Sequence, residues 1–200
     1  LAGAHLGERE TFLALIRDPA FARSLLGQDA PGLEGYLFPE TYFFTKGMTE
    51  AEILKAFVTR YNEKARPRLT VRPFLPSAIM SAHGALTLAS IVEREAAADD
   101  ERPVIAAVFL NRLKKRMPLE SCVTVEYAMG MKKKKLAEKD LLVDSPYNTY
   151  RHMGLPPGPV CNPGLGSIRA VISPAQTDYL FFVALGDRHH AFSKTWAEHK

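Results

Sequence analysis

The chain has 200 residues, of which 46% are hydrophobic and 10% aromatic, so it can bury a core and is not an intrinsically disordered chain. Its net charge of +4 favours anionic partners but does not distinguish nucleic acid, anionic lipid and acidic wall polymer. No run approaches the ~20 apolar residues that a membrane-spanning helix needs, and no signal peptide is visible. Since the sequence begins at Leu1 in mid-pattern, we expect a piece of a longer protein.

The first third of the chain predicts helices on either side of an aromatic segment. Residues 9–26 predict two short helices that are broken at a proline, because the residue before proline avoids the helical conformation. Residues 33–44 are aromatic and β-favouring, with an interrupting glycine and proline, and predict a strand or an edge strand with a bend. A helix begins after Thr49, where Glu52 completes a capping box. The proline-rich residues 66–76 predict a linker.

The rest of the chain predicts a helical core followed by loops and a hairpin. Residues 78–98 predict one helix, and a second helix follows with Pro103 in its first turn. Residues 117–130 predict a loop and then a short helix, whereas residues 145–164 are rich in turn formers. Residues 179–193 predict a hairpin that turns near a Gly-Asp pair, with a short helix after it.

Two carboxylates stand out in the small and apolar run LASIVEREAA, residues 88–97. The helical neighbours of Glu93 are mostly alanines, so burial of that stripe would desolvate its carboxyl and raise its pKa, as a general acid requires. Glu95 has Ile91 and Val92 as neighbours, and the same argument applies to it. Periodicity does not choose between the two glutamates, and both could equally lie on the solvated border of an amphipathic helix.

Other kinds of site find little support in the sequence. His189 and His190 would point to opposite faces of a strand, so they cannot easily share a metal ion. The chain has no Cys-x-x-Cys or His-x-x-x-His spacing, no phosphate loop and no dinucleotide fingerprint. We therefore expect neither a metal nor a cofactor. What remains is carboxylate chemistry with aromatic and amide neighbours, which is typical of a site for a sugar polymer.

Seven segments resemble, in order, the endolytic murein transglycosylases of the MltG or YceG-like family, and they span most of residues 33–199. They are LEGYLFPETY, LASIVEREA, VFLNRL, the loop around LESCVTV, SPYNTY, GLPPGPVCNPG and HHAFSKTWAEH. That family cleaves peptidoglycan glycan strands internally and without water, between N-acetylmuramic acid and N-acetylglucosamine. It leaves 1,6-anhydromuramic ends. The resemblance implies the same activity for this chain.

The resemblance also selects Glu93, because the family's catalytic glutamate corresponds to the first glutamate of SIVERE. Protonated Glu93 would donate to the glycosidic oxygen, and its carboxylate would then take the proton of the C6 hydroxyl that attacks C1. Many relatives carry Gln-Ser/Thr-Asp-Pro at residues 120–123, where this chain lacks the aspartate. Candidates for holding the sugar are Glu120, Ser121, Thr124, Tyr147, Asn148, Tyr150, Phe192 and Ser193.

The chain has two cysteines, Cys122 and Cys161. An even count permits a disulfide, but two cysteines also occur in reduced proteins, and their spacing does not decide between the two states. Both residues fall in expected site loops, and the family acts outside the cytoplasm. The resemblance therefore implies a 122–161 disulfide.

Together these observations predict an α+β protein in three parts. A partial LysM-like module would cover residues 1–46, a connecting helix and proline-rich linker residues 47–76, and a helix-rich catalytic domain with a small antiparallel sheet residues 77–200. The resemblance further implies a single-pass anchor in the inner membrane upstream of this sequence, with the catalytic domain extracytoplasmic. It implies peptidoglycan as substrate, peptidoglycan synthases as partners and no nucleic acid.

Two alternatives stay open. The chain could be a muramidase that uses water, with Glu34, Glu40 or Glu95 as the second carboxylate. It could also be a glycan-binding module that has lost its activity and keeps the loops that bind the wall.

Overall fold

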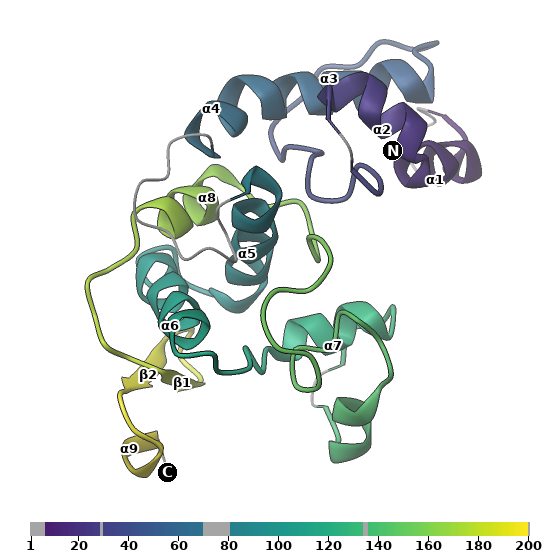
Figure 1. Ribbon diagram of the computed structural model, residues 1–200. Coiled ribbons are helices and arrows are strands. Elements are labelled where there is room, and N and C mark those ends of the chain that lie inside the picture. Colours follow the sequence, from purple (N-terminus) through teal and green to yellow (C-terminus); the bar gives the residue numbers. More distant parts are fainter. Residues whose placement is uncertain (1–6, 29, 70–80, 134–135, 200) are drawn as a thin grey trace.

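The computed structural model describes residues 7–28, 30–69, 81–133 and 136–199. It is rich in helices and has a two-stranded antiparallel sheet, as the expected α+β class requires (Figure 1). The helices are α1 Arg9–Arg17, α2 Pro19–Leu26, α3 Glu50–Lys64, α4 Arg66–Leu69, α5 Ala82–Glu95, α6 Arg102–Lys114, α7 Cys122–Ala128, the 3-10 helix Glu138–Leu142, α8 Leu165–Ile172 and α9 Trp196–His199, and the strands are β1 Phe181–Ala184 and β2 His190–Ser193.

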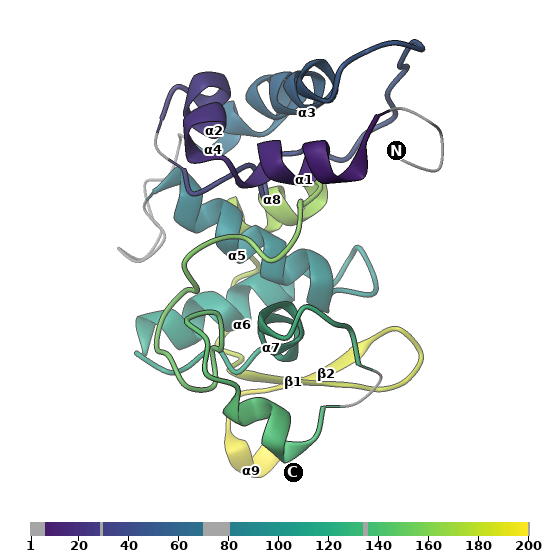
Figure 2. The ribbon, with the colours of Figure 1, turned by 90° about the vertical axis from the view of Figure 1, so that its right-hand side faces the viewer.

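Helices α1 to α4 form a layer at one end of the molecule, above α5 and α6 in both ribbon views (Figures 1 and 2). The predicted break between α1 and α2 is confirmed: Pro19 opens α2, and the Asp18 side chain accepts a hydrogen bond from the Ala20 backbone N–H. The capping box that starts α3 is also confirmed. The Thr49 N–H donates to the Glu52 carboxylate at 2.8 Å, and the Glu52 N–H donates back to the Thr49 hydroxyl.

The strand predicted for residues 33–44 does not form, and turns and irregular backbone take its place. Gly35 has a φ of 89°, and the side-chain oxygen of Asn162 accepts hydrogen bonds from the N–H groups of Gly35 and Leu37. Two of the aromatic residues that suggested a strand, Tyr42 and Phe44, instead pack onto α3, with their ring centroids 4.6 Å and 5.7 Å from that of Phe57. Tertiary contacts have thus replaced the local β preference.

The linker prediction for residues 66–76 is wrong at its start, where residues 66–69 form the short helix α4. Residues 70–76 lie outside the described part of the chain, as do residues 78–80 of the helix predicted for 78–98.

Helix α5 is the centre of the core, because every residue from Gly84 to Val92 is buried. It packs against both α6 and α8, and α6 adds Ile105, Phe109 and Leu110 to the same core. The predicted position of Pro103 in the first turn of α6 is confirmed. Other elements therefore cover α5 on all sides. This packing holds the two glutamates at the C-terminal end of α5 in place.

The C-terminal hairpin forms as predicted, with Phe182 opposite Phe192 in the register of β1 and β2. The short helix α9 follows it, and the Thr195 hydroxyl accepts a hydrogen bond from the Glu198 N–H. In the part of the chain that the structure describes, no helix has the length and apolarity needed to cross a membrane.

Candidate active site

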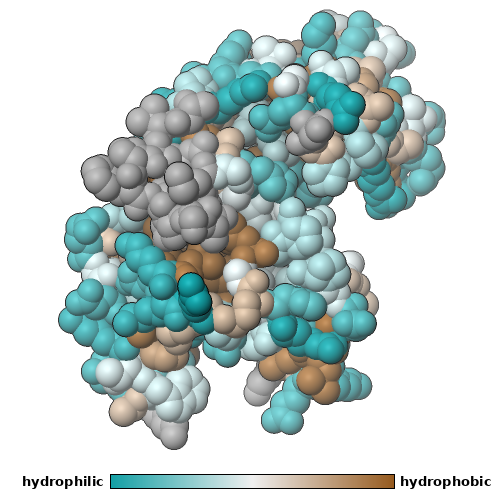
Figure 3. All heavy atoms as spheres, in the orientation of Figure 1, coloured by the Kyte–Doolittle hydropathy of each residue, from teal (hydrophilic) through white to brown (hydrophobic). Residues whose placement is uncertain are grey.

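A pocket of about 420 Å³ lies between the C-terminal hairpin with α9 and the segment that carries α7. We call it the Glu95 pocket, and Figure 3 shows the surface notched between these two parts of the molecule. Its lining comes from α5, α6, α7, the two loops around residues 119 and 150, β1 and α9. The lining residues are Glu95, Phe109, Arg112, Leu119, Glu120, Cys122, Tyr150, Phe181, Phe182, Trp196 and His199.

Glu95 is the last residue of α5, and its carboxyl opens onto this pocket. Burial raises the pKa of Glu95, while a hydrogen bond donated by the Ser121 hydroxyl to Oε1 at 2.5 Å acts in the opposite direction. A carboxyl that is desolvated yet reaches a cavity can keep its proton toward neutral pH and give it to a bound substrate.

Glu93 has a different environment. Its Oε2 accepts hydrogen bonds from the Ser167 hydroxyl at 2.6 Å and from the Gly164 N–H at 3.2 Å, and these two groups belong to the start of α8. The Arg102 guanidinium lies 3.6 Å from Oε1. Glu93 thus caps α8 and is not among the lining residues of the Glu95 pocket. The geometry favours Glu95 as the proton donor, whereas the resemblance selects Glu93.

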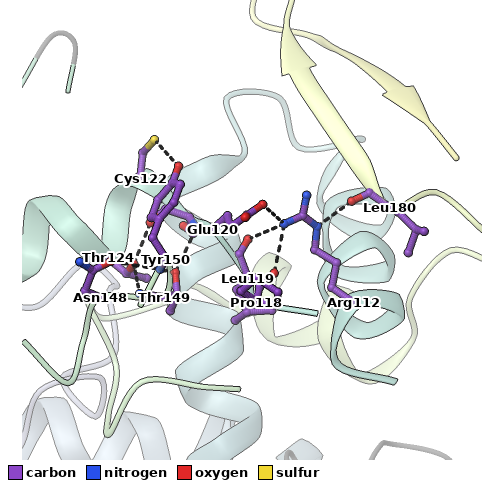
Figure 4. A network of polar contacts seen from close by, with 11 residues as sticks. Arg112, Pro118, Leu119, Glu120, Cys122, Thr124, Asn148, Thr149, Tyr150 and Leu180 are labelled. Atoms are coloured by element: carbon purple, nitrogen blue, oxygen red, sulfur yellow. Dashed lines mark hydrogen bonds and ion pairs between the residues drawn. The ribbon is translucent and has the colours of Figure 1, made fainter. Parts of the chain in front are cut away.

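Of the predicted sugar-binding residues, Glu120 and Tyr150 line the Glu95 pocket, and Ser121 reaches it through its contact with Glu95. Figure 4 shows how Arg112 holds the loop that carries Glu120. The Arg112 guanidinium pairs with the Glu120 carboxylate at 2.9 Å and donates to the carbonyl groups of Pro118, Leu119 and Leu180. One buried arginine therefore ties this loop to the start of the hairpin.

Thr124 and Asn148 do not reach the pocket, because both are fully buried behind it. The Thr124 hydroxyl donates to the Ser121 carbonyl and contacts the Thr149 hydroxyl. The Asn148 amide nitrogen donates to two loop carbonyls, and its oxygen accepts from the Tyr150 N–H (Figure 4). These side chains hold Ser121 and Tyr150 in place, and the fold already uses most of their hydrogen-bonding capacity.

The hairpin residues Phe192 and Ser193 are also not among the lining residues of the Glu95 pocket. Phe192 packs against the core beside Phe182, with 6.2 Å between ring centroids, and Ser193 is buried at the end of β2. They lie opposite Phe182 and Phe181 of β1, which line the pocket. Tyr147 lies in a second pocket, described below, where its ring contacts Tyr127.

The expected disulfide is absent: both cysteines are free thiols. The Cys122 sulfur is exposed in the Glu95 pocket, 3.2 Å from the Tyr150 hydroxyl. The Cys161 thiol donates to the Ser90 carbonyl on α5. Each sulfur is thus held by a different part of the fold.

Several lining residues were not predicted as site residues, among them Arg112, Trp196 and His199. Trp196 and His199 lie in the last segment that carries the resemblance, and this was the one sequence signal that could have pointed to them. Arg112 also lies in such a segment, VFLNRL, but its partners come from positions up to 68 residues away and could not be read from the sequence. Among the described residues, no group of histidines, cysteines and acids could hold a metal ion.

Comparison with known proteins agrees with this architecture. The model of the YceG-like family matches residues 6–200. The chain is 45% identical over 168 residues to a protein from Bacillus subtilis (strain 168) that is named endolytic murein transglycosylase, and the match covers 84% of this chain. A protein of the same name from Streptococcus pneumoniae serotype 2 (strain D39) is 37% identical, and that match covers 88% of this chain.

A crystal structure of a YceG-like protein from Listeria monocytogenes superposes with a TM-score of 0.82 at 39% sequence identity. It covers 96% of this chain and 66% of the other. The chain spans 46% of the length of the Bacillus relative and 33% of the length of the Streptococcus relative.

Proposed function

Because the chain belongs to the YceG-like family, we propose that it cleaves peptidoglycan glycan strands internally as a lytic transglycosylase. The observation that carries the proposal is the position of the Glu95 carboxyl. Burial raises the pKa of this carboxyl, and it opens onto a pocket lined with aromatic and polar side chains. The name endolytic murein transglycosylase, given to relatives at 37% and 45% identity, supports the same reaction class.

In the proposed mechanism one carboxyl performs both proton transfers. Protonated Glu95 donates to the glycosidic oxygen between N-acetylmuramic acid and N-acetylglucosamine, and the C–O bond breaks toward an oxocarbenium-like state. The Glu95 carboxylate then accepts the proton of the muramic C6 hydroxyl as that oxygen attacks C1. The products are a strand with a 1,6-anhydromuramic end and a strand with a free 4-hydroxyl, and Glu95 is again protonated.

Aromatic side chains supply the surface on which a sugar ring can rest. Trp196 is exposed at the mouth of the pocket, and Tyr150 forms its opposite wall. Both combine apolar area with a polar tip, which suits the mixed faces of a pyranose. Glu120 pairs with Arg112 through Oε2, and within the described part of the chain its Oε1 has no hydrogen-bond partner, so it can accept from a sugar hydroxyl.

The hydrolytic alternative requires a second carboxylate that is free to activate water. Glu34 and Glu40 do not line the Glu95 pocket, and Glu40 forms an ion pair with Arg60 on α3. Among the described lining residues, Glu120 is the one other carboxylate, and Arg112 holds it at 2.9 Å. This arrangement supports attack by the substrate's own hydroxyl rather than by water.

The deciding experiment is digestion of purified sacculi by the wild type, Glu95→Gln and Glu93→Gln, with mass analysis of the fragments. We expect anhydro ends from the wild type and a loss of about 10²–10⁴-fold in rate for Glu95→Gln. Glu93→Gln serves as the matched control, and its rate should be within about tenfold of the wild type.

Each contrary result has a clear meaning. Reducing ends in place of anhydro ends would support a muramidase. No difference between the wild type and Glu95→Gln in the fragments released would support an inactive wall-binding module. Loss of activity in Glu93→Gln alone would assign the catalytic role to Glu93, the residue that caps α8.

The remaining expectations belong to the same proposal. A partial LysM-like module over residues 1–46, an inner-membrane anchor upstream, an extracytoplasmic position and peptidoglycan synthases as partners all derive from the resemblance. A strand-trimming enzyme would work where new glycan is made.

A further inference from the structure

A second pocket, of about 440 Å³, lies between α1 and the first turn of α5. We call it the Glu34 pocket. The segment that carries α7 separates it from the Glu95 pocket, since Cys122 and Tyr150 line one and Tyr127 and Tyr147 line the other. Figure 3 shows the corresponding recess between the N-terminal helices and that segment. Its volume is within the ~300–1,000 Å³ of ligand pockets, and the proposed reaction at Glu95 makes no use of it.

Glu34 is the unusual residue of this pocket. Its carboxylate is partly buried, and among the residues that the structure describes it has no hydrogen-bond or ion-pair partner. Burial raises the pKa of Glu34. A half-desolvated carboxylate without a partner, beside the rings of Tyr127 and Tyr147, suits an ammonium group, which would pair with the carboxylate and lie against the aromatic faces.

The histidine and tyrosine side chains of the lining have partners within the fold. His83 Nε2 lies 2.9 Å from the Pro157 carbonyl oxygen, which only accepts, so Nε2 carries the hydrogen. His83 Nδ1 lies 2.8 Å from the Tyr36 hydroxyl, so both ring nitrogens have partners within the fold. Burial raises the pKa of Tyr127 to about 12, so its hydroxyl is protonated at neutral pH. Among the lining residues, Glu34 is the one carboxylate, and the one guanidinium belongs to Arg17 at the exposed rim.

We propose that the Glu34 pocket binds the peptide stem of peptidoglycan, with Glu34 receiving the free side-chain ammonium of the stem's diamino acid and Arg17 pairing with a stem carboxylate. The pocket offers one anion, one cation and apolar walls from Leu13, Ile16 and Pro159, which match a zwitterion on a methylene chain. An N-acetylated sugar carries no ammonium and would leave Glu34 without a partner. This proposal rests on the proposed function, because it assigns a second part of the same polymer to a second pocket.

The distance between the two pockets suits such a substrate. His83 and Glu95 lie at opposite ends of α5, 12 residues apart, which at 1.5 Å per residue is about 18 Å. The diamino acid is the third residue of the stem, so about 10 Å of extended backbone, lengthened by the γ-linkage and by the diamino acid's own side chain, connects the ammonium to the muramic acid. A stem carried by a muramic acid near Glu95 can therefore reach the Glu34 pocket along the α7 segment.

The test measures peptide binding without cleavage, by isothermal titration of the 200-residue chain. The probe is N-acetyl-L-Ala-γ-D-Glu-L-Lys, and the comparison is the same peptide with its lysine amine acetylated. We expect the second peptide to bind at least about tenfold more weakly, and Glu34→Gln to weaken binding of the first peptide by a similar factor. Glu138→Gln removes the same charge at an exposed position away from the pocket and should bind like the wild type.

Equal binding of the two peptides, undiminished binding by Glu34→Gln, or no binding of the probe would overturn the proposal. Displacement of the probe by peptide-free glycan strands would also overturn it, in favour of a saccharide site. Glu95→Gln separates this proposal from the proposed function. It should bind the probe normally while failing to cleave sacculi, so peptide binding and cleavage can each fail without the other.

Discussion

Glu93 and Glu95 are two residues apart on α5, yet their carboxyl groups lie in different chemical environments. Glu93 accepts from Ser167 and Gly164 and lies near a guanidinium, so its oxygens are occupied by the fold. Glu95 has the Ser121 hydroxyl as its close donor and otherwise faces the pocket. For a general acid the second environment is the useful one, because an oxygen without a fixed partner can approach a glycosidic oxygen.

The hydrogen bond from Ser121 makes the pH dependence of the reaction adjustable. Burial raises the pKa of Glu95, and the Ser121 hydroxyl, which stabilises the charged carboxylate, lowers it. Ser121→Ala removes the opposing contribution, so the pKa of Glu95 should rise further and the acid should stay protonated to higher pH. We expect the alkaline limb of the kcat/KM profile for sacculi to move to higher pH. An unchanged limb, or one at lower pH, would contradict Glu95 as the acid.

The two free thiols should differ strongly in reactivity. Cys122 is exposed in the Glu95 pocket, whereas burial raises the pKa of Cys161 to about 12 and leaves little thiolate at neutral pH. Iodoacetamide should therefore modify Cys122 first, as peptide mass spectra would show, and block cleavage by filling the pocket. Cys122→Ser should resist this inactivation. Full activity after quantitative modification of Cys122 would mean that the substrate does not pass this wall.

Helix α8 depends on a side chain from another helix for its N-terminal cap. Its N-cap residue is Gly164, which has no side chain to offer, and Glu93 of α5 accepts from both Gly164 and Ser167 instead. The cap thus joins the two helices that form much of the core.

Removal of the Ser167 hydroxyl should therefore destabilise the fold without removing the acid. Hydrogen bonds to charged groups contribute about 1.5–3 kcal/mol, so Ser167→Ala should lower the free energy of unfolding in urea by about that amount. The exposed Ser173, at the other end of α8, supplies the control Ser173→Ala, which should change stability little. Equal stability of the two variants would show that Glu93 is not a cap.

Elements with local signals were predictable from sequence. The break at Pro19, the capping box of Thr49 and Glu52, and Pro103 at the start of α6 each depend on residues within four positions. The strand expected at residues 33–44 failed because its partners are distant: Asn162 holds the backbone of Gly35 from 127 positions away. Local propensity cannot anticipate such a contact.

In the candidate site, too, features with a local sequence signal were predictable and features that depend on distant residues were not. Tyr150, Glu120 and Ser121 lie in turn-rich segments that carry the resemblance, and the structure places them at the Glu95 pocket. The choice between Glu93 and Glu95 was not accessible, since it depends on Ser167, which lies 74 residues from Glu93. The resemblance gave the reaction class but selected the glutamate that the geometry disfavours.

At the scale of the whole molecule, the backbone of Gly35 in the N-terminal part closely approaches the loop that carries Pro159. Gly35 lies against Pro159, and a Cβ added to it would come within 2.3 Å of the proline Cγ. Asn162, three residues further on, accepts from the Gly35 and Leu37 N–H groups. Since Pro159 also lines the Glu34 pocket, this contact sets the position of the N-terminal helices relative to that pocket.

Gly35→Ala should therefore destabilise the protein for two reasons, and Gly47→Ala can separate them. Both glycines have positive φ, 89° and 94°, so alanine should cost each about 1–2 kcal/mol of backbone strain. A Cβ at Gly47 would meet nothing within 4 Å, whereas one at Gly35 would push Pro159 away and cost about 1–3 kcal/mol more. Urea titrations should show the larger loss for Gly35→Ala, and binding of the stem peptide should weaken in that variant alone. Equal losses in the two variants would mean that the N-terminal layer does not depend on this contact.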